Sequence, residues 1–120
     1  MAEDSITSRS LIKSILENAG YQVVTAVDGM DAWLALQQSD FDALVSDVEM
    51  PQLDGFNLTE KIRANNRLMH LPVVLVTALQ SAEDRLRGLE AGANAYILKS
   101  SFDQDNLLEI LQRLLAMEQG

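Results

Sequence analysis

Apolar positions along the chain follow two alternating patterns, one typical of amphipathic helices and one typical of buried strands. Helical spacing predicts five helices, at 5–19, 30–38, 55–65, 81–91 and 103–118. Short apolar or β-branched runs predict four strands, at 21–27, 42–47, 71–77 and 94–99. Because helices separate the strands and the strands lack polar alternation, the pattern predicts a doubly wound α/β fold with a mainly parallel sheet.

Length and composition predict a single domain over residues 1–120. A chain of 120 residues with 48% hydrophobic content can bury one substantial core but not two. Asp and Glu number 18 against 9 Lys and Arg, and the net charge of −9 disfavours binding to nucleic acid or an anionic membrane. The chain has no cysteine, and no apolar stretch approaches the roughly 20 residues of a membrane helix. We therefore expect a cytoplasmic protein whose partners are proteins or cations.

Polar side chains stand at the ends of three of the predicted strands. Asp47, Thr77 and Lys99 each close one of these apolar runs. The carboxyl ends of parallel strands meet at one edge of the sheet, where ligands bind in open α/β folds. A carboxylate, a hydroxyl and an ammonium at that edge indicate a site that handles a phosphoryl group.

The segment 46–55, S-D-V-E-M-P-Q-L-D-G, resembles the D-x-x-M-P-x-x-D-G signature of receiver domains from bacterial two-component response regulators. Thr77 lies 30 residues after Asp47, Lys99 follows Thr77 by 22, and 92–96, G-A-N-A-Y, is similar to the family's G-A-x-x-[YF] stretch. These elements in this order make the resemblance specific, and it covers essentially the whole chain. It implies a flavodoxin-like sheet with strand order 2-1-3-4-5.

The resemblance implies a role for each site residue. Asp47 would be the phosphoacceptor that takes a phosphoryl group from a histidine kinase or phosphotransfer domain, while Thr77 and Lys99 contact the phosphoryl oxygens. The family's acidic pair corresponds to Glu3 and Asp4. Mg²⁺ would be held by Glu3, Asp4, Asp47 and the backbone carbonyl of Glu49. The domain would catalyse only its own phosphorylation and dephosphorylation, without external turnover.

The resemblance also implies a conformational switch. Thr77 would move toward phosphorylated Asp47, and Tyr96, at the family's aromatic switch position, would rotate inward. The face formed by the fourth helix, fifth strand and fifth helix would then change shape for a downstream protein.

The chain departs from the family at its amino end. Receiver domains have a complete apolar strand at the sheet centre before the acidic pair, whereas only Met1 and Ala2 precede Glu3 here. We therefore expect most or all of that strand to be missing, and Mg²⁺ to bind more weakly than in complete relatives. Truncation, direct pairing of 21–27 with 42–47, and a segment from another chain remain open as explanations. The last of these includes a homodimer or strand exchange.

A second departure follows the conserved lysine. The family usually has a proline there, joined by a cis peptide, and this chain has Ser100 after Lys99. A trans or a strained cis peptide must serve instead.

Two other functions remain open. The chain could be a receiver-shaped interaction or dimerisation module without phosphorylation chemistry, or a small phosphohydrolase that uses Asp47 and Glu49, although it has no room for the usual cap. Simpler interpretations are that Asp47 caps loop amides and that Tyr96 packs on the sheet edge. The start 3–9 resembles receivers fused to chemotaxis-type histidine kinases.

Overall fold

The computed structural model describes residues 1–101 and 103–119. The helices are α1 (Ile6–Asn18), α2 (Gly29–Gln38), α3 (Gly55–Arg63), α4 (Ala82–Ala91) and α5 (Gln104–Gln119). The strands are β1 (Leu44–Ser46), β2 (Val73–Thr77) and β3 (Ala95–Leu98), and a short 3₁₀ turn, η1 (Lys99–Ser101), follows β3. Within the described part of the chain the three strands pair in parallel in the order β1-β2-β3. The predicted α/β class with a parallel sheet is confirmed.

Local hydrogen bonds explain where the helices begin. Four of them start after a residue whose side chain accepts a hydrogen bond from the amide three positions later, and these caps are Ser5, Asp28, Asp54 and Ser81. After α4, Gly92 has a φ of 106°, which is the left-handed conformation that glycine adopts without strain. The predicted helix boundaries therefore agree with the observed ones to within about two residues.

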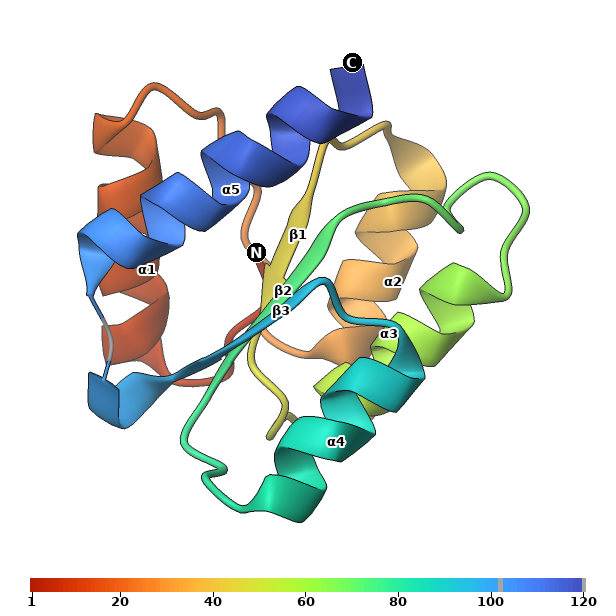
Figure 1. The fold of residues 1–120 in the computed structure, drawn as a ribbon. Coiled ribbons are helices and arrows are strands. Elements are labelled where there is room, and N and C mark those ends of the chain that lie inside the picture. Colours follow the sequence, from red (N-terminus) through yellow and green to blue (C-terminus); the bar gives the residue numbers. More distant parts are fainter. Residues whose placement is uncertain (102, 120) are drawn as a thin grey trace.

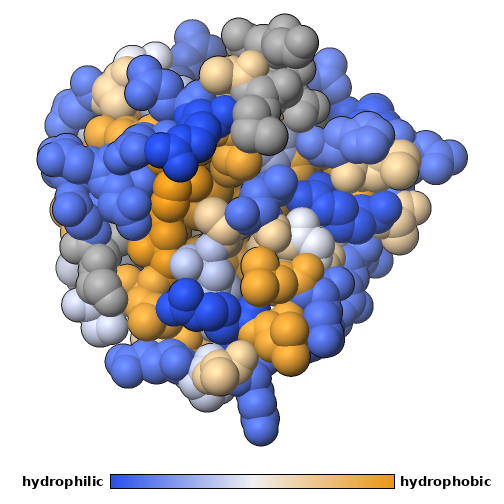
Figure 2. All heavy atoms as spheres, in the orientation of Figure 1, coloured by the Kyte–Doolittle hydropathy of each residue, from blue (hydrophilic) through white to orange (hydrophobic). Residues whose placement is uncertain are grey.

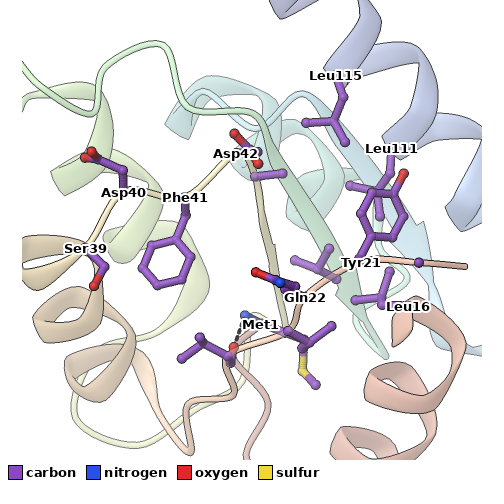
Figure 3. A pocket seen from close by; sticks show the side chains of 15 residues that line it. Met1, Leu16, Tyr21, Gln22, Ser39, Asp40, Phe41, Asp42, Leu111 and Leu115 are labelled. Atoms are coloured by element: carbon purple, nitrogen blue, oxygen red, sulfur yellow. Dashed lines mark hydrogen bonds between the residues drawn. The ribbon is translucent and has the colours of Figure 1, made fainter. Parts of the chain in front are cut away.

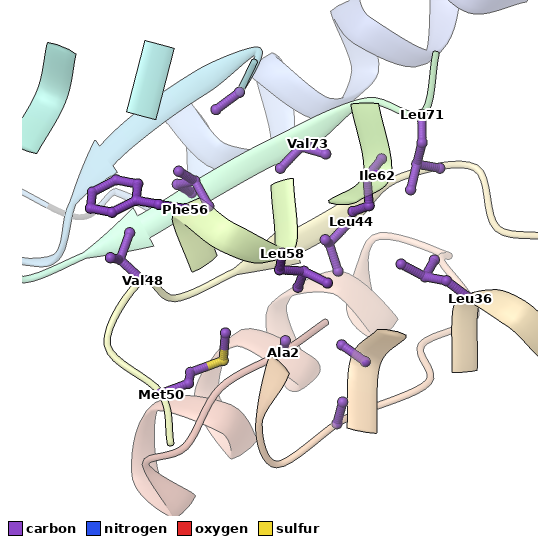
Figure 4. Close-up of a cluster of buried hydrophobic side chains, with 14 of the residues drawn as sticks. Ala2, Leu36, Leu44, Val48, Met50, Phe56, Leu58, Ile62, Leu71 and Val73 are labelled. Carbon is purple, nitrogen blue, oxygen red and sulfur yellow. The ribbon is translucent and has the colours of Figure 1, made fainter. Parts of the chain in front are cut away.

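Helices cover both faces of the sheet, with α1 and α5 on one side and α2, α3 and α4 on the other (Figure 1). The core beneath α2 and α3 is drawn in Figure 4 and includes Leu58 and Ile62 of α3 and Val73 of β2. A second cluster packs α1 and α5 against the opposite face and includes Leu107 and Leu111. Strand side chains alternate between the two clusters, as the period of a β-strand requires.

Residues 21–27 do not form the strand that their β-branched residues predict. Only Ala26 forms a bridge, which is parallel to Ala2. Val24 and Ala26 are the residues of this segment that are hydrogen-bonded to Met1–Glu3. The local propensity is therefore overridden by the tertiary context.

The first three residues occupy the centre of the sheet. Met1–Glu3 forms backbone hydrogen bonds with Val24 and Ala26 on one side and with Val45 and Asp47 on the other, at 2.8 to 3.1 Å. Direct pairing across the gap, one of the explanations left open above, therefore does not occur. The same residues bring the acidic pair to the carboxyl edge of β1.

The surface mixes hydrophilic residues with strips of apolar atoms, as the face shown in Figure 2 illustrates. On α4, Leu86 and Leu89 are 55% and 54% exposed. Within the described residues, no helix has the length and apolar character needed to cross a membrane.

The central position of Ala2 predicts a large effect of proline there. Ala2→Pro removes the N–H that donates to Val45 O at 2.8 Å, and we expect it to lower the free energy of unfolding by about 3 kcal/mol. Ile6→Pro is the matched control, because proline is well tolerated at the first position of a helix and Ser5 is already extended. Urea denaturation measures both variants, and equal effects would contradict the role assigned to Ala2.

Candidate functional site

Asp47 follows β1 directly and lies at the carboxyl edge of the sheet, where its side chain is mostly buried. Its Oδ1 accepts a hydrogen bond of 2.7 Å from Val48 N, and its Oδ2 lies 3.1 Å from Lys99 Nζ. The start of α3 approaches closely, because Gly55 N donates to Val48 O at 2.8 Å. A Cβ at position 55 would lie 2.4 Å from the carbonyl oxygen of Asp47. The signature therefore needs its glycine to bring α3 against the phosphoacceptor candidate.

Lys99 bridges two carboxylates. Its Nζ lies 3.2 Å from Glu3 Oε1 and 3.0 Å from Glu3 Oε2, in addition to its contact with Asp47. The Glu3 side chain is 1% exposed, and its Oε1 also accepts a hydrogen bond of 3.1 Å from Ser5 N. One ammonium group for two buried carboxylates leaves the cluster with excess negative charge.

The pKa values of this cluster are shifted by competing effects. Burial raises the pKa of Glu3, the hydrogen bond from Lys99 opposes this shift, and the nearby charge of Asp47 adds to it. Burial alone would lower the pKa of Lys99, but its hydrogen bonds with Glu3 and Asp47 outweigh that effect and raise it. Lys99 therefore stays protonated. Ionising Glu3 remains unfavourable because the group is buried and lies near the charge of Asp47.

Thr77 and Tyr96, the two predicted switch residues, hold the same loop residue. Thr77 ends β2 at the same edge as Asp47, is fully buried, and accepts a hydrogen bond of 3.3 Å from Leu79 N through its Oγ1. The Tyr96 hydroxyl donates to Leu79 O at 2.9 Å. The ring of Tyr96 packs against Gly88, where a Cβ would lie 2.8 Å from the ring. Both residues thus anchor the backbone of the loop after β2.

The predicted metal ligands are only partly brought together. Glu3 and Asp47 share Lys99, whereas the side chains of Asp4 and Glu49 are exposed. No three His, Cys, Asp or Glu side chains within 1–101 and 103–119 are grouped to hold a metal ion. Glu3 Oε2 is nevertheless buried without a hydrogen-bond partner, although it lies close to the lysine nitrogen. Its position and the excess charge suit a small cation with oxygen ligands.

Arg9 was not predicted to belong to the site. Its Nη1 donates to Glu3 O at 2.9 Å and to Asp4 O at 3.3 Å, which fixes the backbone of the acidic pair. No motif in the sequence indicates this role, because the contacts are to carbonyl oxygens that every residue carries.

The departure after Lys99 does not displace that side chain. The peptide between Lys99 and Ser100 is trans, since no cis peptide occurs in the described residues. Lys99 reaches both carboxylates from the beginning of η1. The serine at this position is therefore compatible with the ion pairs of the site.

Comparisons with known proteins agree with this arrangement. The family model for the response regulator receiver domain matches residues 1–112. The chain belongs to the response regulator receiver domain family. This receiver chain is 36% identical over 115 residues to chemotaxis protein CheY-3 of Vibrio cholerae, covering 95% of this chain and 88% of that protein.

Similarity extends to parts of longer proteins and to solved structures. This receiver is 33% identical over 114 residues to the gliding motility regulatory protein of Myxococcus xanthus, covering 95% of this chain and 15% of that protein. The chain also spans only about half the length of another curated relative, response regulator Rre1 of Synechocystis, at 52%. The crystal structure of the PA1611 receiver domain of a Pseudomonas aeruginosa sensor histidine kinase matches with a TM-score of 0.88 and 33% identity, covering 96% of this chain and 93% of that one. The predicted family and flavodoxin-like receiver fold are thus confirmed.

The buried charge of Glu3 predicts a pH-dependent stability effect. The raised pKa means that the folded receiver binds this proton more tightly than the unfolded chain, so stability falls as pH rises above the ordinary glutamate value of 4.5. Without divalent cations, we expect Glu3→Gln to raise the free energy of unfolding at pH 7, because the variant has no carboxylate to ionise in the buried site. The gain should vanish near pH 3.5, where Glu3 is protonated in both states.

Denaturation at several pH values tests this expectation. Glu17→Gln is the matched control, because Glu17 is an exposed glutamate on α1. A stability difference for Glu3→Gln that does not change with pH would show that the charge of Glu3 is not responsible.

Proposed function

We propose that this chain is a phosphoacceptor receiver domain of a two-component system, in which Asp47 receives a phosphoryl group from a histidine kinase or phosphotransfer domain. The observation that carries the proposal is the contact of 3.1 Å between Asp47 Oδ2 and Lys99 Nζ at the carboxyl edge of the sheet. It pairs a carboxylate nucleophile with a cation suited to the oxygens of a transferred phosphoryl group.

The transfer requires little beyond positioning and charge neutralisation. A carboxylate oxygen of Asp47 forms a bond to phosphorus as the P–N bond of the phosphohistidine breaks, and the imidazole takes up a proton. Lys99 would then contact a phosphoryl oxygen. The Thr77 hydroxyl would donate to another phosphoryl oxygen.

The donor set of the site fits Mg²⁺. This ion prefers oxygen ligands and keeps several waters, so it needs only one or two protein carboxylates. Glu3 and Asp47 would hold it, with Asp4 and the carbonyl of Glu49 as further predicted ligands. When bound, Mg²⁺ would neutralise the carboxylates and the phosphoryl oxygens. Its presence in a relative supports this assignment, since the PA1611 receiver domain has a magnesium ion coordinated in the active site cleft.

The contacts of Leu79 suggest how phosphorylation would reach the surface. If the Thr77 hydroxyl turns toward a phosphoryl oxygen, Leu79 N loses its acceptor and the loop after β2 is released on one side. Tyr96, which holds the carbonyl of Leu79, would then change its position. The face of α4, β3 and α5 would shift between two packings and bind a downstream protein.

Phosphodonor labelling tests the proposal. With acetyl phosphate and Mg²⁺, intact-protein mass spectrometry should show one added phosphoryl group on the wild type and none on Asp47→Asn. Asp54→Asn is the matched control, because asparagine also caps a helix and α3 should be retained. A wild type that folds, binds Mg²⁺ and remains unlabelled would indicate an interaction module instead, and steady hydrolysis of small phosphate esters would indicate a phosphohydrolase.

Mg²⁺ binding can be measured without phosphorylation. We expect Mg²⁺ to raise the thermal unfolding temperature in a saturable way, because it binds the folded site and relieves the repulsion between Glu3 and Asp47. Glu3→Gln should bind Mg²⁺ more weakly by about tenfold or more, whereas Glu17→Gln should bind it like the wild type. Equal affinities in the two variants would remove Glu3 from the predicted ligands.

A further inference from the structure

The loop between β1 and α3 packs against the beginning of α2. Gly29, the first residue of α2, is buried, and a Cβ at this position would overlap the carbonyl group of Leu53 and lie 2.8 Å from the Leu53 Cβ. Atoms that are not bonded to one another do not pack so closely, so a side chain at position 29 would force the loop and the helix apart. Gly29 therefore permits an approach of the loop that no other residue would allow.

The backbone conformation of α2 does not require this glycine. Within the described residues, the glycines with a positive φ are Gly20 and Gly92, whereas Gly29 has a helical conformation that any residue can adopt. Alanine has a much higher helix propensity than glycine. What glycine provides at position 29 is therefore space for the loop.

The loop has little freedom to absorb a displacement of Leu53. Leu53 N donates to Pro51 O at 2.8 Å, and Gln52 between them has a φ of 73°, which is an unfavourable conformation for a residue with a side chain. Met50 is buried in the core beneath α2 and α3 (Figure 4). A shift at Leu53 would therefore be transmitted along the loop to Glu49, whose backbone carbonyl is a predicted Mg²⁺ ligand.

The segment before α2 is tied to the acidic pair. Ala26 O accepts a hydrogen bond of 3.1 Å from Glu3 N, and Ala26 precedes Gly29 by three residues. Asp28, between them, caps α2. Gly29 therefore lies between the segment that is hydrogen-bonded to Glu3 and the loop that carries Glu49. The contact at Gly29 fixes the separation of these two groups of predicted ligands.

We propose that Gly29 is a positioning residue for the Mg²⁺ site, because its missing side chain lets the loop 48–54 approach α2 closely enough for the Glu49 carbonyl to share one ion with Glu3 and Asp47. This inference rests on the proposed function, since it concerns the ion that the phosphoryl transfer would use. Gly29 itself would not contact the ion. A side chain at position 29 would separate the ligands and weaken Mg²⁺ binding.

Gly29→Ala tests the proposal, and Gly20→Ala is its matched control. Gly20 has a φ of 98°, and apart from its chain neighbours no atom lies within 4 Å of a Cβ there, so alanine would strain the backbone without displacing another segment. Gly20 lines the cavity drawn in Figure 3, which lies at the amino end of β1, whereas Asp47 follows the carboxyl end. Without Mg²⁺, both variants should have a lower thermal unfolding temperature than the wild type.

The two variants should differ in their affinity for Mg²⁺. In calorimetric titrations with MgCl₂, Gly29→Ala should bind Mg²⁺ at least about tenfold more weakly than the wild type, as is typical when a residue that orients metal ligands is changed. Gly20→Ala should bind it like the wild type. With acetyl phosphate, the Mg²⁺ concentration that gives half of the maximal labelling rate should rise for Gly29→Ala alone. Equal Mg²⁺ affinities of the two variants would overturn the proposal.

A titration of the wild type examines the same contact without a substitution. In NMR spectra, the amide signals of Gly29 and Leu53 should shift with a common half-saturation as Mg²⁺ is added, while those of Gly20 and Gly92 stay in place. A Gly29 signal that does not respond would overturn the proposal even if Gly29→Ala fails to fold. A wild type that binds Mg²⁺ but accepts no phosphoryl group would contradict the proposed function alone, and the ratio of the Mg²⁺ affinities would still decide the role of Gly29.

Discussion

The hydrogen bonds of Met1–Glu3 with the segments on either side are the constraint on which the site depends. These three residues lie in the centre of the sheet and are hydrogen-bonded to the segments on both sides. Their position fixes Glu3 at the carboxyl edge of the sheet, within reach of Lys99 and next to Asp47. Without this pairing the acidic pair would belong to a free terminus, and Lys99 would retain only one carboxylate partner.

The position of Glu3 also makes the site unfavourable for stability. Two buried carboxylates share one ammonium, and Glu3 Oε2 has no hydrogen-bond partner among the described residues. Excess buried charge costs free energy. The same excess of negative charge would favour the divalent cation proposed for this site. Stability and the proposed chemistry therefore place opposite demands on Glu3.

The sequence predicted those parts of the structure that depend on local or repeated patterns. Helix boundaries were predicted well because caps such as Ser5 and Asp54 act within a single turn. Asp47 and Lys99 could be placed together because polar residues at the ends of parallel strands share one edge. The strand at 21–27 was predicted wrongly, because its pairing depends on contacts with a segment distant in the chain, and only Ala26 forms a bridge to it. Arg9 was missed for a related reason, since its contacts are to backbone carbonyls.

The loop residue Leu79 is hydrogen-bonded to both of the predicted switch residues. Thr77 holds its amide and Tyr96 holds its carbonyl, so a change at either hydroxyl alters the restraint on the same peptide segment. Gly88 restricts how the ring of Tyr96 can move. Because glycine has no side chain, the ring packs directly against the backbone of α4 at this position. Any movement of the Tyr96 ring is therefore a movement relative to α4. Closely packed contacts of this kind change between discrete arrangements. This proposed coupling passes through the side chains of Thr77 and Tyr96 and the backbone of one loop residue, so the two ends of the proposed switch meet at Leu79.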